Sequence, residues 1–207
     1  MEGLHTIQQL IRRNDYITKV DLSDFYMHFL ISKADRRYMR FMWEGKKYQC
    51  VGMPFGLAPA PRLATNMMAP VIRYLRSCGL RLAIYIDDLI LLSRSYKESI
   101  EHTQLLVDTL HSLGFGIHPD KCSVIPSRSA EFLGTQVNSK TMQFRVPRDK
   151  IRSTRREIRS VFSENEVGKL TVRKFCSLLG KLNALSGAVV SAQLHLWPLH
   201  HLMRQQL

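Results

Sequence analysis

The chain has 207 residues, of which 45% are hydrophobic, so it is long enough to bury a core in one or two domains. Thirty basic residues against seventeen acidic ones give a net charge of +13, which is large for an enzyme of small-molecule metabolism. This excess favours a polyanionic partner, nucleic acid first and an anionic membrane surface second. A basic face that simply meets solvent is the alternative.

No apolar run is long enough to predict a membrane span, and between the two candidate partners we expect nucleic acid and no membrane. The first twenty residues lack the pattern of a signal peptide. The four cysteines lie far apart, without the spacing of a metal site or a redox pair. Reduced thiols of this kind are typical of intracellular proteins, and we predict a cytoplasmic or nuclear chain that is not secreted.

The first third of the chain predicts short elements of both kinds. In order they are a helix over 4–13, a strand over 16–22, a turn or helical start over 24–28, and a hairpin that runs from 29–32 into 38–43 and on through 44–47 into 48–51. Residues 52–61 hold three prolines and two glycines and cannot form regular structure. A helix is expected from Pro61 to Cys78, ended by Gly79.

Two adjacent carboxylates, Asp87 and Asp88, lie between the apolar runs 82–86 and 89–92. The pattern predicts two paired strands with the acids at or beside a tight turn. Acids placed between such runs repel each other and lose hydration, and a divalent cation would compensate both costs. The alternative is an ordinary hairpin with an acidic turn, since Asp is a common turn residue.

The remainder of the chain changes character once. Ser95 and Glu98 form a capping box for a helix that ends at Gly114, and a strand over 115–118 and a hairpin of 131–137 with 142–146 follow. After Pro147 the segments 148–163, 171–186 and 189–204 read as helices, the first of them strongly basic. We therefore predict an α+β domain with an antiparallel sheet over 1–146 and a basic helical subdomain over 147–207.

Asp21, at the end of the strand over 16–22, adds a third acid. If this strand and the hairpin around Asp87 and Asp88 are neighbours in one sheet, the three carboxylates can converge. Such a set is typical of a pair of Mg²⁺ ions, with Mn²⁺ as the alternative ion, that stabilises the attacking and leaving oxygens in phosphoryl transfer. The basic chain would supply the field for a nucleic-acid substrate.

Five segments, in this order and spacing, resemble reverse transcriptases. They are 21–26 (DLSDFY), 53–57 (MPFGL), 85–88 (YIDD), 113–122 (LGF with PDKC) and 131–134 (EFLG). The resemblance covers roughly 4–146 and is greatest to DIRS-type retrotransposons, with gypsy-type elements next. It implies a polymerase palm with partial fingers, followed by a thumb-like or connection-like helical unit.

The resemblance also implies roles at the acids. Asp21 and Asp87 would be the main metal ligands, Asp88 the third acid, and the carbonyl of Leu22 an extra ligand. Leu133 and Gly134 would form a hairpin that grips the primer, although ordinary strand packing is an equal alternative.

The other implied roles concern the incoming nucleotide. Tyr26 would be a steric gate against a ribose 2′-OH, with a core aromatic as the alternative. Lys121 lies near the family's proton donor to pyrophosphate, but the neighbouring position holds Cys122, so a solvated lysine stays open. The nucleotide-binding positions implied in this way are Leu22, Ser23, Asp24, Phe25, Tyr26, Phe55, Gly56 and Lys121.

The resulting hypothesis is an RNA-directed DNA polymerase domain that copies an RNA template from a DNA or RNA primer with deoxynucleoside triphosphates. Only twenty residues precede Asp21, and no ribonuclease H segment follows. We therefore expect a piece of a longer polyprotein or a chain that has lost its upstream fingers. The alternatives are a truncated remnant that binds nucleic acid without catalysis, and a polymerase that copies RNA into RNA.

Overall fold

The computed structural model describes residues 2–189 and 191–205. Contacts group the chain into two compact units, Met1–Ala130 and Glu131–Leu207, which we describe one at a time. The division falls within a strand and precedes the boundary predicted at Pro147. No helix of the described ranges is long and apolar enough to cross a membrane.

The first unit is built on an antiparallel sheet with β1 (Tyr16–Ser23) at its centre. On one side β1 pairs with β5 (Asp88–Ser93), which pairs with β4 (Arg81–Tyr85). On the other side it pairs with β6 (Gly116–Ile117) and with β7 (Ser123–Ser127). The register of β1 with β5 runs without interruption from Tyr16↔Ser93 to Asp21↔Asp88.

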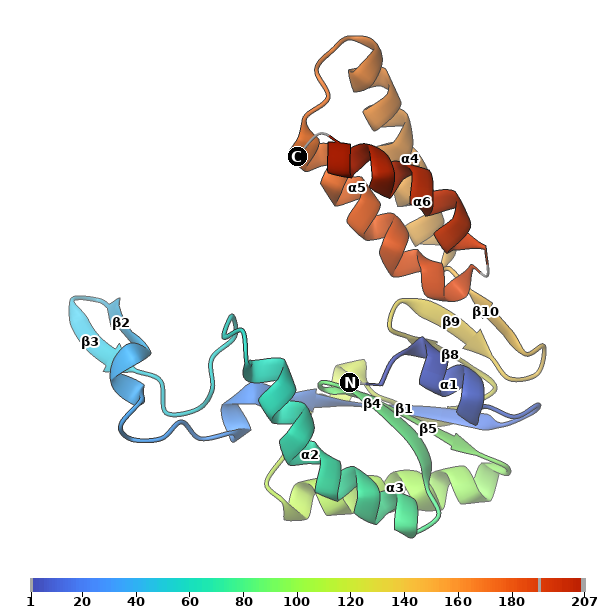
Figure 1. Ribbon diagram of the computed structural model, residues 1–207. Helices are drawn as coiled ribbons and strands as arrows, with labels where there is room; N and C mark the ends of the chain where they lie inside the picture. Colours follow the sequence, from blue (N-terminus) through green and yellow to red (C-terminus); the bar gives the residue numbers. More distant parts are fainter. Residues whose placement is uncertain (1, 190, 206–207) are drawn as a thin grey trace. The chain divides into compact units, whose positions relative to one another are not determined.

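Helices complete the first unit. They are α1 (Leu4–Leu10), α2 (Ala60–Ser77) and α3 (Tyr96–Ser112). Figure 1 shows α2 and α3 beneath the sheet and α1 above it. The predicted capping box at the start of α3 is confirmed: Ser95 accepts the N–H of Glu98, and the Glu98 side chain accepts the N–H of Ser95.

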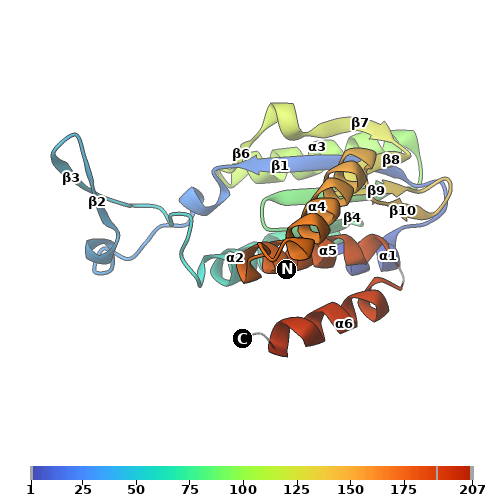
Figure 2. The ribbon, with the colours of Figure 1, turned by 90° about the horizontal axis from the view of Figure 1, so that it is seen from above.

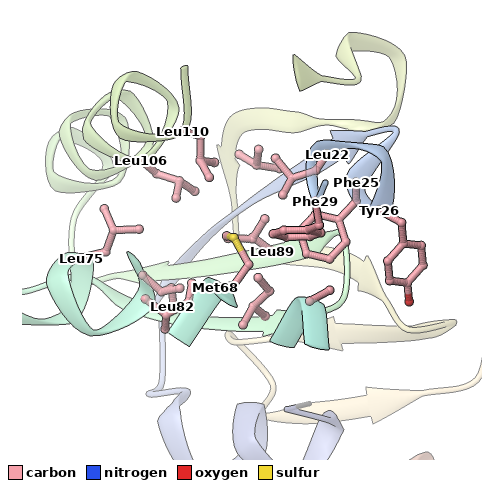
Figure 3. Packing of buried hydrophobic residues seen from close by; sticks show 14 of the residues in the cluster. Leu22, Phe25, Tyr26, Phe29, Met68, Leu75, Leu82, Leu89, Leu106 and Leu110 are labelled. Atoms are coloured by element: carbon pink, nitrogen blue, oxygen red, sulfur yellow. The ribbon is translucent and has the colours of Figure 1, made fainter. Parts of the chain in front are cut away.

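The main core lies between the sheet and the two helices α2 and α3. Met68 and Leu75 of α2 meet Leu82 and Leu89 of the sheet, and Leu106 of α3 closes the layer (Figure 3). The side chains of β5 are buried on both faces of the sheet. This explains why the sequence there is a continuous apolar run rather than an alternating one.

The segment after β1 differs from its prediction in one place. The strand expected over 29–32 is wrong, because only Leu30 pairs, in an isolated bridge with Gly52. Phe29 is drawn into the core instead, while Leu30 is 74% exposed. The two following strands form as β2 (Arg40–Trp43) and β3 (Lys46–Gln49), joined by a two-residue turn at Glu44-Gly45.

Gly52 lies so close to Met27 that a side chain has no room. A Cβ at this position would come within 2.9 Å of the Met27 Cα and nearer still to its carbonyl oxygen. We expect Gly52→Ala to lower the free energy of unfolding by about 1–3 kcal/mol, because backbone must move to admit the methyl group. Urea denaturation of this variant and of Gly3→Ala, where nothing lies within 4 Å, measures the difference. Equal stability of the two variants would contradict the expectation.

The second unit contains a three-stranded antiparallel sheet and three helices. The strands are β8 (Ser129–Phe132), which begins before the boundary of the unit, β9 (Thr135–Asn138) and β10 (Gln143–Arg145), in the order β10-β9-β8. The helices are α4 (Arg148–Glu166), α5 (Val172–Leu185) and α6 (Ala192–Gln205). The predicted α+β class, with an antiparallel sheet followed by basic helices, is confirmed.

Candidate active site

The three acidic residues picked out from the sequence come together at one end of the main sheet. Asp21, near the end of β1, is the direct cross-strand partner of Asp88, the first residue of β5. Asp87 lies in the turn before Asp88, and its carbonyl accepts the N–H of Leu22 at 2.9 Å. The strand that carries Asp21 and the hairpin that carries Asp87 and Asp88 are therefore neighbours in one sheet, as the convergence of the three acids requires.

The turn that carries Asp87 is conformationally unusual. Tyr85 pairs with Asp88, so the connection consists of Ile86 and Asp87 alone. Ile86 has φ +60°, which is rare for a β-branched residue and costs about 1–3 kcal/mol. The surrounding strand pairs hold this conformation in place, and strain of this kind is concentrated at functional sites.

Two lysines lie against the acids. Lys19 Nζ is 3.2 Å from Asp88 Oδ1, and Lys121 Nζ is 3.6 Å from Asp21 Oδ1. Both of these carboxylate oxygens are buried, and the lysine ammonium groups are the polar partners that the described residues offer them. A buried carboxylate oxygen that has one cationic neighbour still has lone pairs that a metal ion or a proton can take.

The acidic residues have the ligand chemistry of a magnesium site, but their side chains are not arranged around one metal position. Within residues 2–189 and 191–205 no group of three or more acidic, histidine or cysteine side chains is arranged around one metal position. However, the buried carboxylate oxygens of Asp21 and Asp88 that face the two lysines are hard donors of the type that Mg²⁺ prefers. A cation bound there would replace the lysine contacts.

The pKa of Asp88 is raised to about 6, chiefly because burial penalises the charged carboxylate; Lys19 opposes the shift, and Asp21 and Asp87 add to it. The folded chain therefore binds this proton more tightly than the unfolded chain does, and stability falls as pH rises from about 4 to 6. We expect Asp88→Asn to stabilise the metal-free chain by about 1–2 kcal/mol at pH 7.5 and by much less at pH 4.

Urea denaturation in a chelator at both pH values measures this effect. Asp108→Asn, at an exposed position of α3, is the matched control. A stabilisation by Asp88→Asn that is the same at both pH values would contradict the assignment.

Cys122 and His118 hold the backbone of Asp21 from the other side. The N–H of Asp21 points to Cys122 Sγ at 3.2 Å, and the carbonyl of Asp21 accepts the N–H of His118 at 2.9 Å. Burial raises the pKa of the Cys122 thiol, so the thiol stays protonated near neutral pH. Cys122 therefore acts here as a packing and backbone contact.

The residues after Asp21 combine a tight bend with aromatic packing. Ser23 ends β1, and Asp24 adopts a left-handed conformation that starts a short 3-10 helix. Phe25 is buried in the core, whereas the Tyr26 ring lies at the core's edge with its hydroxyl pointing away (Figure 3). Phe55 packs edge-on against Tyr26 with 5.3 Å between ring centroids and is 68% exposed.

The position of Tyr26 near the acids affects its hydroxyl. Burial, followed by the charge of Asp87, raises the pKa of this phenol, so the hydroxyl remains a neutral hydrogen-bonding group. Gly56 has φ +92°, a conformation that favours glycine, and keeps the chain beside Phe55 free of a side chain.

Leu133 and Gly134 belong to the second unit. They form the two-residue turn between β8 and β9, both with positive φ. The side chain of Lys150 crosses Gly134 so closely that a Cβ there would collide with its ammonium group, and Lys150 also lies 3.5 Å from Glu131. Leu133 and Gly134 thus lie in a tight turn, and their contact with the primer stays a prediction.

A model of the family described as "Reverse transcriptase (RNA-dependent DNA polymerase)" matches residues 1–137. The chain belongs to the reverse transcriptase family. The antiparallel sheet around β1 is accordingly the palm sheet expected of this family.

Similar sequences occur in polyproteins of viruses and transposons. The chain is 26% identical over 171 residues to a Pro-Pol polyprotein of feline foamy virus, covering 81% of this chain and 13% of that protein. It is 28% identical over 123 residues to the retrovirus-related Pol polyprotein of transposon 297 of Drosophila melanogaster, covering 58% of this chain and 11% of that protein. For transposon gypsy of the same fly the identity is 24% over 134 residues, covering 65% and 13%. The chain thus spans about an eighth of these relatives.

Solved structures agree on the fold. A foamy viral protease-reverse transcriptase in complex with an RNA/DNA hybrid matches with a TM-score of 0.72 at 19% identity, covering 99% of this chain and 26% of that one. A second foamy viral protease-reverse transcriptase structure, in complex with double-stranded DNA, matches with a TM-score of 0.70 at 18% identity. The match covers 99% of this chain and 34% of that one. The predicted relation to reverse transcriptases of retroelements is confirmed, while the relation to DIRS-type elements in particular is not shown.

Two residues in and just after β1 were not picked out from the sequence. Lys19 precedes Asp21 by two positions on a strand, so the two side chains share a face, and this alternation was the available signal. His28 accepts the N–H of Gly116 at 3.2 Å and ties the segment after β1 to β6. That contact joins positions 88 residues apart in sequence, and no local pattern indicates it.

Proposed function

We propose that this chain is the catalytic palm of an RNA-directed DNA polymerase, which extends a primer 3′-OH by a nucleotide taken from a deoxynucleoside triphosphate. One observation carries the proposal: the register of β1 with β5, which places Asp21 opposite Asp88 beside the strained turn at Asp87. Membership of the reverse transcriptase family supports the same reaction class.

In this proposal Asp21 and Asp87 hold two Mg²⁺ ions, with Asp88 and the Leu22 carbonyl as further ligands. Bound metal would supply charge stabilisation for the transferred phosphoryl group and lower the pKa of the primer hydroxyl. The protein's own contribution is positioning, because phosphoryl transfer leaves little covalent work to side chains. Lys19 and Lys121 are the cations that the metal would displace from the acids, and Lys121 then becomes free to meet the triphosphate.

The backbone N–H groups of Ser23, Asp24 and Phe25 would receive the triphosphate, with Phe55 and Gly56 beside the nucleotide. The left-handed conformation of Asp24 supports this role, since such bends expose successive N–H groups to an anion. Phe55 packs against Tyr26 and is 68% exposed, which suits its ring for contact with a base.

Tyr26 would select deoxyribose. We expect Tyr26→Ala to raise the incorporation of ribonucleotides relative to deoxynucleotides by about tenfold or more, because removing the ring opens space for a 2′-OH. Single-nucleotide extension with dTTP and UTP measures the ratio, and Tyr26→Phe is the control that keeps the ring. An unchanged ratio would reduce Tyr26 to a core aromatic. A native chain that uses both nucleotides equally would favour the RNA-copying alternative.

The test of the function is extension of an oligo-dT primer on poly-rA with dTTP and Mg²⁺. The proposal expects extension that a chelator abolishes, with binding of the template-primer followed in parallel by fluorescence anisotropy. Binding without extension, at low salt and with excess protein, would support the non-catalytic remnant instead.

The context of the chain is also part of the proposal. We infer that it belongs to a longer polyprotein of a retroelement, DIRS-type by its motifs and gypsy-type next, and that it acts in the cytoplasm or nucleus. Since the chain spans about an eighth of its relatives, the reading frames on either side of the coding sequence test this inference directly.

A further inference from the structure

The second unit contains a cavity between β10, α4 and the helix pair α5–α6. The helices α5 and α6 lie side by side (Figures 1 and 2). The cavity lies where the end of α5 and the start of α6 meet the first two turns of α4, and all of its lining residues belong to this unit. Its volume is about 650 Å³, which falls within the range of roughly 300–1,000 Å³ that small-molecule sites occupy.

The wall of the cavity is apolar. Five hydrophobic side chains from β10, the segment after it, α4 and α5 line the cavity and are only half-buried, namely Phe144, Val146, Ile151, Leu182 and Leu185. Half-buried side chains of this size keep apolar surface in contact with water, which is unfavourable. A ligand with an apolar body would remove that surface from water.

Cationic residues line the same cavity. Arg148, Ile151 and Arg155 are spaced by three and four residues, so the two arginines share the face of α4 that lines the cavity. Arg145 of β10 and His195 of α6 line it as well. These arginines and the histidine are exposed, so they stand at the mouth. Among the described residues that line the cavity, none is acidic.

The acidic residues of the second unit pair with other cations. The ion pairs are Glu131 with Lys150, Glu157 with Lys181 and Glu164 with Lys174. Within the part of the chain that the structure describes, Arg145, Arg148 and Arg155 form no ion pair with a carboxylate. Residues 131–207 contain thirteen basic and five acidic residues, a net charge of +8. The mouth of the cavity therefore attracts an anion.

We propose that this cavity binds an amphiphilic monoanion, with a single carboxylate on an apolar chain of the fatty-acid type. The chain lies against Ile151, Leu182 and Leu185, and the carboxylate meets Arg148 and Arg155 at the mouth. A guanidinium group holds a carboxylate through two parallel hydrogen bonds, which suits these arginines for such a head group.

Two other occupants fit the cavity less well. A nucleic-acid strand carries charge along its whole length, so its phosphates would meet the arginines and leave the apolar wall uncovered. A helix of a partner protein places its apolar anchors over two turns or more, whereas this cavity has the volume of a small-molecule site. Binding of the monoanion needs neither Mg²⁺ nor template, so its test is independent of the proposed polymerase function.

Methyl NMR of the full chain with labelled isoleucines tests the proposal at Ile151. Decanoate, 1-decanol and decyltrimethylammonium carry the same alkyl chain on an anionic, a neutral and a cationic head group, and each is added below its micelle-forming concentration. We expect decanoate to shift the Ile151 methyl signal to saturation and to bind at least about tenfold more tightly than the cationic probe. The signals of Ile7 and Ile17, in the core of the first unit, should stay unchanged.

Variants separate the mouth of the cavity from its wall. Arg148→Gln and Arg155→Gln, combined in one chain, should lower the affinity for decanoate about tenfold and leave the affinity for 1-decanol unchanged. Arg152→Gln, on the same helix but outside the cavity lining, is the matched control and should change neither affinity. Leu185→Trp should abolish the binding of both probes, because the larger side chain fills the cavity.

Several outcomes would overturn the proposal. They are an Ile151 signal that decanoate leaves unchanged, equal affinities for the anionic and cationic probes, and equal losses from the paired arginine variant and from Arg152→Gln. Shifts of Ile7 and Ile17 as large as that of Ile151 would show general association with a surfactant and would also refute the site. A shift of Ile151 by oligo-dT, with none by decanoate, would assign this surface to nucleic acid instead.

Discussion

Asp87→Asn is expected to lower the rate of primer extension by about 10³-fold or more while template-primer binding persists. The substitution keeps the size of the side chain and removes the charge that a divalent ion requires. It leaves the backbone contact intact, since the carbonyl of Asp87, not its side chain, accepts the N–H of Leu22. The loss should therefore fall on catalysis and not on the fold.

Single-turnover extension under saturating template-primer measures the rate, and anisotropy measures the affinity. Asp108→Asn, which removes an exposed carboxylate of α3, is the matched control and should extend at the native rate. Thermal unfolding should be the same for both variants. Native-like extension by Asp87→Asn would refute the metal-ligand role, and an equal loss of binding would move the residue to substrate contact.

Arg81→Ala is expected to lower the free energy of unfolding by about 3–5 kcal/mol. Arg81 holds the carboxylate of Asp15 with two hydrogen bonds, of 2.7 and 2.8 Å, and also donates to the carbonyl of Leu10. Asp15 is 2% exposed and accepts the N–H of Arg12. Without the guanidinium a buried charge loses its main partner, at the junction of α1, β1 and β4.

Urea denaturation compares this variant with Lys97→Ala. Lys97 pairs with Glu101 at 3.7 Å on the solvent side of α3, where both side chains are largely exposed, and its loss should cost at most about 0.5 kcal/mol. The double variant Asp15→Asn with Arg81→Ala should be more stable than Arg81→Ala alone, because no buried charge then remains. Similar small losses for Arg81→Ala and Lys97→Ala would contradict the assignment.

Much of the local structure could be predicted because it depends on neighbours in sequence. The capping box at Ser95 and Glu98, the apolar runs around Asp87 and the glycine stop at Gly79 are all short-range signals. Prediction failed where distant contacts decide. The expected strand over 29–32 reduces to one bridge, and no element was predicted for β7, whose Pro126 lowers the strand signal but is tolerated at a sheet edge.

The candidate site divides in the same way. From its residues alone the sequence determined that Asp21, Asp87 and Asp88 are acids set among apolar strand residues, which makes them costly unless a cation compensates. Only the tertiary structure decided that β1 and β5 are neighbours in the register Asp21↔Asp88, and that Lys19 and Lys121 are the cations now beside two of the acids. The physical reason is that alternation defines a strand locally, whereas its partner and register follow from packing between residues far apart in the chain.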